Sequence, residues 1–249
     1  MTSSGTSTDV QQAMDTYWHR RAPHYHDHQR RTQTAAIRDF WTRLWQDALP
    51  AAPIEVLDVG TGTGEVAAVL ARLGHRVTAI DTAAGMLELA RQRPLDSTGG
   101  GSVVWQHGDA VRPPFPPASF DAVTSRYVLW TLRDPVAALE RWRALLRPGG
   151  RLVAVDSTWF PEGIHPTGPA GDASRLPEFQ RHYTRAVTAR LPLAEADSIT
   201  PAVRAVEAAG FEDVTLEPLE PLERLQTQAA IPSDHDIRLQ YLITATAPR

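Results

Sequence analysis

The sequence predicts an α/β fold built on a doubly wound, mostly parallel sheet. Short apolar runs alternate with segments of helical periodicity over residues 54–155. Continuous apolar runs of this length are typical of strands that are buried on both faces. Three glycines, Gly60, Gly62 and Gly64, follow the first run directly, and an acid, Asp81, closes the second. The glycines are therefore expected where the first strand turns into the first helix.

Seven segments are predicted as strands because they are short and mostly apolar. They lie at residues 54–59, 77–81, 103–109, 120–125, 152–155, 214–219 and 241–247. Helical patterns separate most of them. The first such helix has Gly74 as its expected C-terminal stop, since glycine accepts the left-handed conformation there. A later helix is expected to end at the turn signal "RPGG" of residues 147–150.

Two helices are predicted ahead of the first strand. Apolar residues of the first follow helical spacing over 10–21, and Pro23 is expected to end it. The second covers 37–48 with a clear i, i+3, i+4, i+7 pattern. We therefore expect an N-terminal helical cap or lid at 1–50, ahead of a cofactor-binding domain at 51–249.

Residues 159–198 lose the strand–helix alternation and are rich in Pro, Gly, Arg and His. They are interpreted as an insertion over a substrate pocket. Its candidate lining residues are Trp159, Phe160, His182 and Tyr183, which could instead form the core of the insertion itself. Order returns at Thr200 and Pro201, which resemble a helix N-cap followed by proline in the first turn.

Composition narrows the classes of function. The chain has 249 residues, a net charge of −4 and no cysteine. The absence of cysteine excludes disulfides, thiolate metal sites and cysteine nucleophiles. A basic surplus, which nucleic-acid binders usually carry, is missing. The N-terminus lacks the apolar core of a signal peptide, and no apolar run approaches the roughly 20 residues that span a bilayer. We expect a cytoplasmic protein with neither a membrane nor a nucleic acid as partner.

The alternating glycines indicate a bound nucleotide-like cofactor rather than a plain tight turn, for which one glycine would suffice. Two cofactors compete at this point. The string "GTGEVA" at 62–67 fits the dinucleotide pattern G-x-G-x-x-G/A, which taken alone is a weak signal. Asp58, two residues before Gly60, is not part of that pattern.

The longer string "LDVGTGTG" at 57–64 resembles the first motif of class I S-adenosylmethionine (SAM) dependent methyltransferases. The strings "GDA" at 108–110, "FDAVTSRYVLWTLRDP" at 120–135 and "LLRPGGRL" at 145–152 resemble later motifs of that family in the expected order. The resemblance is strong over 54–158 and is closest to the ubiquinone/menaquinone-biosynthesis type. It implies a Rossmann-like seven-stranded sheet with an antiparallel last strand, and SAM as cofactor.

The resemblance also implies which residues contact SAM. Asp81 suits the ribose hydroxyls, because an ionised carboxylate has two acceptor oxygens. Asp109 is expected at the adenine amine, Met86 against the adenosine, and Arg126 near the methionine end. Helix capping, turn formation, core packing and a surface ion pair are the respective alternatives for these four. The full predicted set is Tyr25, Asp58, Gly60, Thr61, Gly62, Asp81, Thr82, Met86, Asp109, Ala110, Ser125 and Arg126.

Catalytic residues are harder to assign, because methyl transfer needs a general base only where the acceptor loses a proton. The candidates are His182, Tyr183 and His26. The cluster "HRRAPHYHDH" at 19–28 suggests a metal site at first sight, but Pro23 and the lack of a carboxylate pair disfavour one, so we predict none. A solvated surface segment and a lid over the cofactor are the other two interpretations.

The sequence thus predicts methyl transfer from SAM to O, N or C of a small-molecule acceptor. An NAD(P)-dependent oxidoreductase and a SAM-binding protein without catalytic activity are the alternatives. The oxidoreductase leaves Asp58 and the "GDA" and "PGGRL" strings unexplained. The identity of the acceptor and the oligomeric state are not encoded in any motif.

Overall fold

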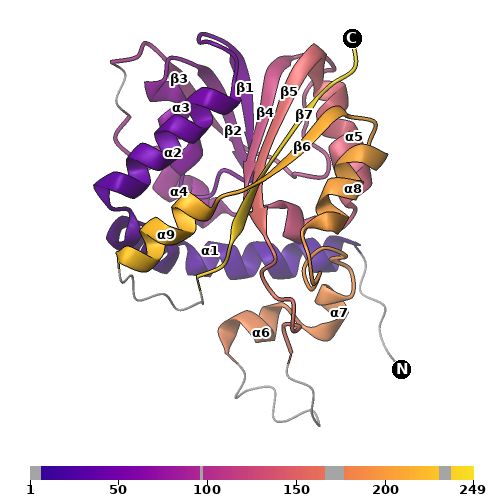
Figure 1. The fold of residues 1–249 in the computed structure, drawn as a ribbon. Coiled ribbons are helices and arrows are strands. Elements are labelled where there is room, and N and C mark those ends of the chain that lie inside the picture. Colours follow the sequence, from indigo (N-terminus) through magenta and orange to yellow (C-terminus); the bar gives the residue numbers. More distant parts are fainter. Residues whose placement is uncertain (1–6, 96–97, 166–176, 230–236) are drawn as a thin grey trace.

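The computed structural model describes residues 7–95, 98–165, 177–229 and 237–249 (Figure 1). Seven strands form one sheet in the order β3-β2-β1-β4-β5-β7-β6. Pairing is parallel throughout except at β7, which runs antiparallel to both β5 and β6. The predicted α/β class and the antiparallel last strand are confirmed. The strands are β1 Glu55–Val59, β2 Arg76–Asp81, β3 Ser102–His107, β4 Phe120–Arg126, β5 Leu146–Ser157, β6 Glu212–Pro218 and β7 Gln240–Thr246.

The order of the strands reverses beside β1. The chain passes outward from β1 to β2 and β3, and then returns to place β4 on the other side of β1. Val59 at the end of β1 is aligned with Ile80 of β2 and with Ser125 of β4. Ligands of open α/β sheets bind beyond the carboxyl ends of the strands at such a reversal. The turn that follows Val59 therefore occupies the expected binding crevice.

Helices cover both faces of the sheet, which explains why its central strands are almost wholly apolar. One face packs against α5 and α8. The other packs against α2, α3 and α9, and Trp45 of α2 is 1% exposed there. The helices are α1 Ser7–Thr32, α2 Ala35–Ala48, α3 Glu65–Arg72, α4 Ala84–Gln92, η1 Leu129–Thr131 (a 3₁₀ turn), α5 Pro135–Leu145, α6 Glu178–His182, α7 Arg185–Thr188, α8 Thr200–Ala208 and α9 Glu220–Gln228.

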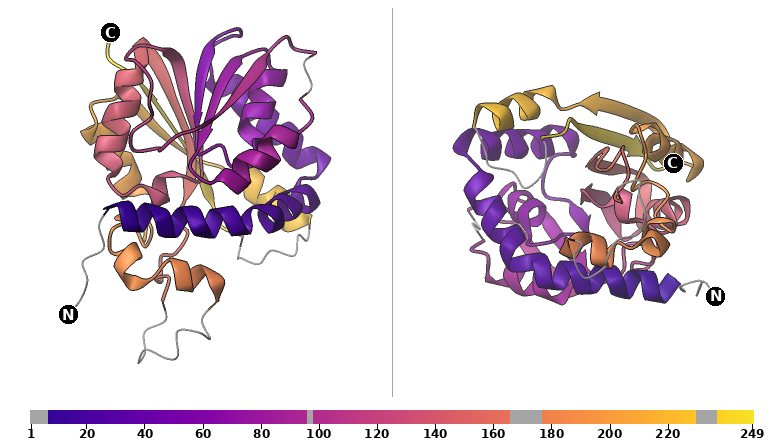
Figure 2. Two further views of the ribbon diagram at one scale, coloured as in Figure 1. Left: turned by 180° about the vertical axis from the view of Figure 1, so that it is seen from behind. Right: turned by 90° about the horizontal axis from the view of Figure 1, so that it is seen from below.

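Helix α1 crosses the edge of the sheet formed by the carboxyl ends of the parallel strands (Figures 1 and 2). The expected stop at Pro23 is wrong, because α1 continues through this proline to Thr32. A proline removes one backbone donor, here the partner of the His19 carbonyl. Burial on either side offsets that loss, since Ala22 is fully buried and Gln29 is 7% exposed. Within the described residues 7–50, α1 crosses this edge, whereas α2 lies on a face of the sheet.

The contact between α1 and the start of α4 is unusually close. The backbone N–H of Gly85 donates to His19 Nδ1 at 2.9 Å. A side chain at position 85 would meet the His19 carbonyl oxygen, because an added Cβ atom would lie 2.6 Å from it. Glycine at this position therefore permits α1 to lie directly on α4.

Three further boundaries differ from the sequence prediction. The "RPGG" segment lies inside β5, where Gly149 has a φ of +75°. Helix α8 has Ile199 as its N-cap, so Thr200 is already helical. Helix α9 was not predicted, because its charged and exposed residues give a weak apolar pattern. The expected insertion at 159–198 contains α6 and α7, and its residues 166–176 lie outside the described ranges.

Candidate active site

The turn after β1 depends on two glycines with different surroundings. Gly60 and Gly62 have φ values of +66° and +56°, in the left-handed region that favours glycine. An added Cβ atom at Gly60 would lie 2.3 Å from Cγ2 of Val128, so the turn is pressed against the segment after β4. At Gly62 an added Cβ would have no neighbour within 4 Å. Gly60 thus fits the protein closely, while Gly62 leaves open space.

Asp81, at the end of β2, holds this turn in place. Its Oδ2 accepts the backbone N–H of Gly62, and its Oδ1 accepts that of Ala83, both at 2.8 Å. Burial raises the pKa of Asp81, and these two hydrogen bonds oppose the increase. Each carboxylate oxygen has more than one acceptor site, so capacity remains for ligand hydroxyls.

Asp58 lies inside the sheet rather than at the edge of the pocket. It is 1% exposed and accepts hydrogen bonds from the hydroxyls of Thr61 at 2.6 Å and Thr124 at 2.9 Å. Burial raises its pKa to about 6. Asp58 therefore joins the glycine turn to β4 and acts on a ligand only through that turn.

A cavity of about 640 Å³ lies between the carboxyl edge of the sheet and α1. Its volume falls within the usual range for pockets that enclose small ligands. Nine of the twelve residues predicted to contact the cofactor line it, while Asp58, Thr61 and Ser125 lie behind the wall. The nine are Tyr25, Gly60, Gly62, Asp81, Thr82, Met86, Asp109, Ala110 and Arg126.

Two of these residues are already engaged by the protein. Asp109 accepts the backbone N–H of Val111 at 2.9 Å and forms an ion pair with Arg133 at 2.6 Å. Met86 is 3% exposed and packs against Ala22 of α1. Both nevertheless line the cavity, so each can contact a ligand while keeping its structural contacts.

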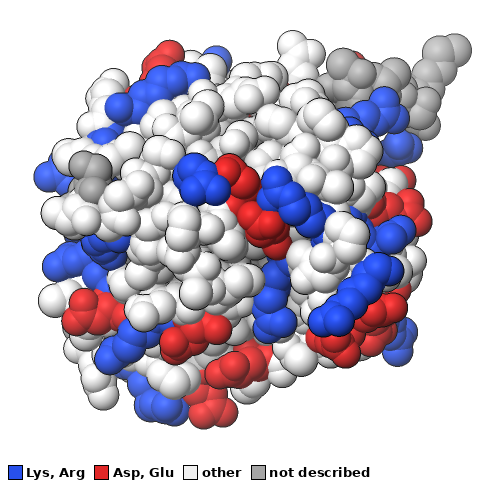
Figure 3. Space-filling model, turned by 90° about the horizontal axis from the view of Figure 1, so that it is seen from above, with Lys and Arg blue, Asp and Glu red and all other residues white. Residues whose placement is uncertain are grey.

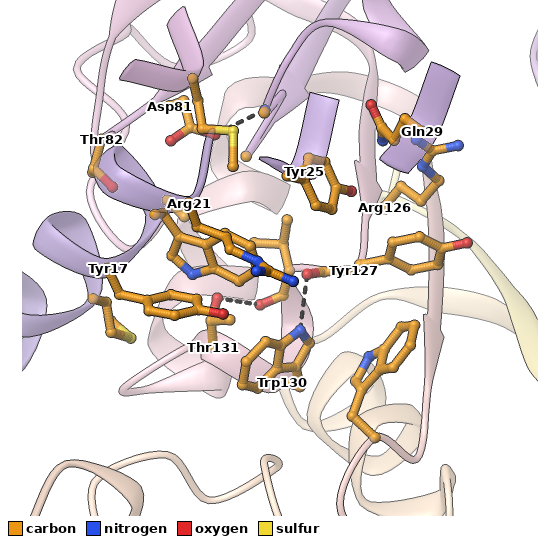
Figure 4. A pocket seen from close by; sticks show the side chains of 18 of the residues that line it. Tyr17, Arg21, Tyr25, Gln29, Asp81, Thr82, Arg126, Tyr127, Trp130 and Thr131 are labelled. Carbon is orange, nitrogen blue, oxygen red and sulfur yellow. Dashed lines mark hydrogen bonds between the residues drawn. The ribbon is translucent and has the colours of Figure 1, made fainter. Parts of the chain in front are cut away.

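Arg126 lies at the opposite end of the pocket from Asp81 and Thr82 (Figure 4). Its guanidinium carbon lies 4.9 Å from the centre of the Trp41 ring and 5.1 Å from that of Tyr127. Among the described residues, no carboxylate forms an ion pair with it. Burial raises the pKa of the neighbouring Tyr25 phenol, so this group stays neutral beside the arginine.

The rest of the pocket has an aromatic wall, which we define as Tyr17, Trp18, Tyr127, Trp130, Trp159, Phe160 and Phe179. Each of its indole N–H groups has an acceptor within the protein. Trp159 donates to Asp156 Oδ1 at 2.6 Å, Trp130 to the Tyr127 carbonyl at 3.0 Å, and Trp18 to the Tyr183 hydroxyl at 2.9 Å. The wall therefore presents ring faces and edges rather than free indole donors.

None of the three catalytic candidates lines this cavity. Tyr183 is fully buried behind the aromatic wall, and His182 is half-buried on α6. His26 is half-buried on α1, outside the set of lining residues. The histidines that do line the pocket are His24 and His28, one turn apart on α1.

Many of the pocket residues that the sequence analysis missed are on α1, including Arg21. Treating Pro23 as a helix end concealed a regular spacing of three or four residues along this whole helix. The lining residues with that spacing are Gln11, Met14, Asp15, Trp18, Arg21, Tyr25, His28, Gln29 and Thr32. Outside α1 the missed residues include Trp41, Tyr127, Trp130, Thr131, Phe179, Gln226, Arg238 and Gln240. The described ranges contain neither a helix long and apolar enough to cross a membrane nor a cluster of side chains suited to a metal ion.

Comparisons with known proteins agree with this fold. Residues 57–154 match a family described as a methyltransferase domain. The phosphoethanolamine N-methyltransferase 2 of Haemonchus contortus, solved with S-adenosylhomocysteine, superposes with a TM-score of 0.60 at 19% identity, covering 85% of this chain and 53% of that one. The [4+2]-cyclase SpnF gives a TM-score of 0.58 at 20% identity, covering 84% and 80%. The fold is therefore the Rossmann-like fold of the class I SAM-dependent methyltransferases.

Within that class, the sequence is similar to the ubiquinone/menaquinone-biosynthesis type, as the motifs predicted. The demethylmenaquinone methyltransferase of Deinococcus radiodurans is 37% identical over 156 residues, which cover 61% of this chain and 63% of that protein. The chain spans about half the length of the curated relatives it matches.

Proposed function

We propose that this protein transfers a methyl group from SAM to a small-molecule acceptor bound in the 640 Å³ pocket. The observation that carries the proposal is the pairing of Asp81 with the glycine turn at the carboxyl edge of the sheet. Asp81 retains acceptor capacity for two ribose hydroxyls. Gly62 leaves room for a ligand directly beside it. These features suit SAM, and the match of residues 57–154 to a methyltransferase domain favours it over a dinucleotide.

The remaining proposed contacts with SAM are assigned from the residues at the two ends of the pocket. Asp109 and Met86 are proposed at the adenine, and Thr82 beside the ribose. Arg126 is proposed to bind the carboxylate of the methionine moiety, because it lines the pocket and no carboxylate of the described residues forms an ion pair with it. Tyr25 is proposed to contact the same end from α1.

Bound SAM supplies a methyl group that is already activated by its positively charged sulfur. The protein then has to position the acceptor and exclude water. We propose that α1 does both, as a lid formed within residues 1–50 over the domain 51–249. If the acceptor loses a proton, His24 and His28 replace His182, Tyr183 and His26 as the proposed bases, because they line the pocket.

The proposed partners are small molecules only. On the face opposite α1, positive and negative side chains are interspersed and form no continuous basic surface (Figure 3). A nucleic-acid partner would require such a surface.

Calorimetric titration tests the cofactor. SAM and S-adenosylhomocysteine should bind with the same stoichiometry, and NAD should show no binding. Asp81→Asn should weaken binding at least tenfold, since hydrogen bonds to a charged group contribute about 1.5–3 kcal/mol each. The exposed residue Glu220 offers a matched control, so Glu220→Gln should bind normally. Binding of NAD together with a silent SAM titration would overturn the proposal in favour of an oxidoreductase.

A mass-spectrometric screen tests the reaction. The enzyme is incubated with SAM and pooled small molecules, and products heavier by one methyl group are sought together with S-adenosylhomocysteine. Because the similarly folded SpnF is named a cyclase, this step also separates methyl transfer from binding without methyl transfer. SAM binding without any methylated product across aromatic, aliphatic and amine acceptors would contradict the proposed reaction.

A further inference from the structure

Charges within the pocket are separated along its length. The acidic lining residues are Asp15, Asp81 and Asp109. We call the part of the pocket around Asp81, Thr82 and Asp109 the ribose end. Asp15 belongs to it, because Gln11 donates to Asp15 at 2.7 Å and to the hydroxyl of Thr82 at 3.2 Å. The basic lining residues are Arg21, His24, His28, Arg126 and Arg238. The part of the pocket away from the ribose end therefore has basic side chains and no carboxylate among its described lining residues.

Arg238 lies next to the aromatic wall. Strands β5 and β7 are antiparallel, with Ser157 aligned to Gln240. Two residues beyond this pair, Trp159 follows β5 and Arg238 precedes β7, and both line the same cavity. Two contacts fix the alignment, since the Ser157 hydroxyl donates to the Leu239 carbonyl at 2.7 Å and the Tyr127 hydroxyl bonds to Gln240.

Arg238 is half-buried, and no hydrogen bond or ion pair engages its side chain within the described residues. A partly desolvated arginine without a carboxylate is unfavourable unless a ligand supplies the anion. Arg126 has the same property and is assigned to the cofactor's carboxylate. The pocket thus has a second arginine without an ion pair among the described residues, and the cofactor has no second carboxylate to pair with it.

The aromatic wall restricts the chemical class of ligand whose anionic group could pair with Arg238. Its three indole N–H groups are already bonded within the protein, so the wall offers dispersion and stacking rather than hydrogen bonds. The centres of the Tyr127 and Trp159 rings lie 4.9 Å apart, with an interplanar angle of 80°. An edge-to-face pair of this kind suits a flat ring more than a flexible chain. Arginine binds carboxylates through a planar fork of donors.

We propose that the methyl acceptor is a planar aromatic acid, whose ring packs on the aromatic wall and whose anionic group pairs with Arg238. This inference rests on the proposed function, because it assigns Arg126 and the ribose end to SAM. It specifies the class of acceptor for the same pocket. Arg21 lies across the middle of the pocket in Figure 4 and adds positive potential there.

Direct binding tests the proposal without turnover. The protein is saturated with S-adenosylhomocysteine and titrated at pH 7.5 with benzoate, 2-naphthoate and their neutral amides, using tryptophan fluorescence and calorimetry. At least one acid should bind tenfold or more tightly than its amide. Arg238→Gln should abolish that difference while leaving affinity for S-adenosylhomocysteine within twofold of wild type.

Arg224→Gln is the matched control, since Arg224 is an exposed arginine of α9 outside the lining set. It should retain the preference for the acid. Equal affinities of acid and amide, tighter binding of benzylamine, or an unchanged preference in Arg238→Gln would each overturn the inference. These results are distinguishable from failure of the proposed function, which would appear first as an absence of binding of S-adenosylhomocysteine.

Discussion

The two ends of the pocket are built in different ways. At the ribose end, short turns after consecutive strands present backbone groups and carboxylates, with Gly62 and Asp81 only 19 residues apart. At the aromatic end, Tyr17, Trp130 and Phe179 come from helices far apart in sequence. The first end is defined by local sequence and the second by tertiary packing. A cofactor site encoded locally can be retained while the segments that form an acceptor site change around it.

The largest expected effect lies in the glycine turn. Gly60→Ala forces a left-handed φ on alanine, at a cost of about 1–2 kcal/mol, and drives its Cβ atom into Val128. Affinity for S-adenosylhomocysteine should fall at least a hundredfold by calorimetry. Gly62→Ala carries the same backbone strain without a clash in the protein, so it should lose less stability in thermal denaturation. Wild-type affinity in both variants would mean that this turn does not contact the cofactor.

Helix α1 connects the two ends, so its response to ligand is the next largest effect. Lids come from the less stable parts of a fold. Hydrogen exchange over residues 9–30 should slow at least tenfold on addition of S-adenosylhomocysteine. Exchange in β4, which is buried on both faces, should change little. If α1 exchanges at the same rate with and without ligand, it is a fixed wall and not a lid.

At the aromatic end, Trp159→Phe keeps a flat ring but removes the hydrogen bond to Asp156. The ring should then be held less firmly, and affinity for 2-naphthoate should drop severalfold while affinity for S-adenosylhomocysteine stays constant. Trp105→Phe, at a tryptophan on β3 outside the lining set, should leave both affinities unchanged. A parallel loss of both affinities in Trp159→Phe would show that the two ends are not independent.

The smallest effect concerns pH and is shared by the two ends. Burial raises the pKa of Asp58 and of Asp156 to about 6, against an ordinary value of 3.8. Between these values the folded state binds more protons than the unfolded state, so the contribution of each group to stability falls as pH rises from about 4 to 6. Asparagine does not titrate, so Asp58→Asn and Asp156→Asn should each remove that group's pH-dependent loss of stability.

The midpoint of thermal unfolding, measured from pH 4 to 7, reports this effect. The difference between variant and wild type should become more positive as pH rises through that window, by about 2–4 °C for each kcal/mol. A difference that does not vary with pH would mean that the carboxyl group titrates near its ordinary value. A change in only one of the two variants would show that the two ends differ in this respect as well.

The sequence predicted the ribose end well because its signals are local. Strand β1, the glycines and Asp81 lie within about 25 residues of each other. The glycines permit the left-handed turn after β1, and Asp81 accepts hydrogen bonds from backbone groups close to it in sequence. Asp58 shows the limit of this approach. Its side chain is directed by Thr124, a residue of β4 that enters only through strand pairing.

The aromatic end was predicted only in part. Trp159 and Phe160 were expected at the pocket, whereas Trp130 was not, because no local pattern relates η1 to α1. The error at Pro23 caused more pocket residues to be missed. Ending the predicted helix there concealed the spacing that places Arg21 and His28 on the side facing the pocket. The local rule for proline failed because packing on both sides of Pro23 outweighs one missing backbone hydrogen bond.

The contact between His19 and Gly85 has a consequence for the timing of the catalytic cycle. Pro23 provides no N–H for the His19 carbonyl, so α1 has a weak point opposite the residue whose missing side chain lets it approach α4. If α1 acts as the proposed lid, its movement away from the edge of the sheet breaks a single hydrogen bond at this joint rather than a turn of helix. The residue at position 85 determines how closely α1 rests on α4 and, for a lid of this kind, how long a ligand stays enclosed beneath it.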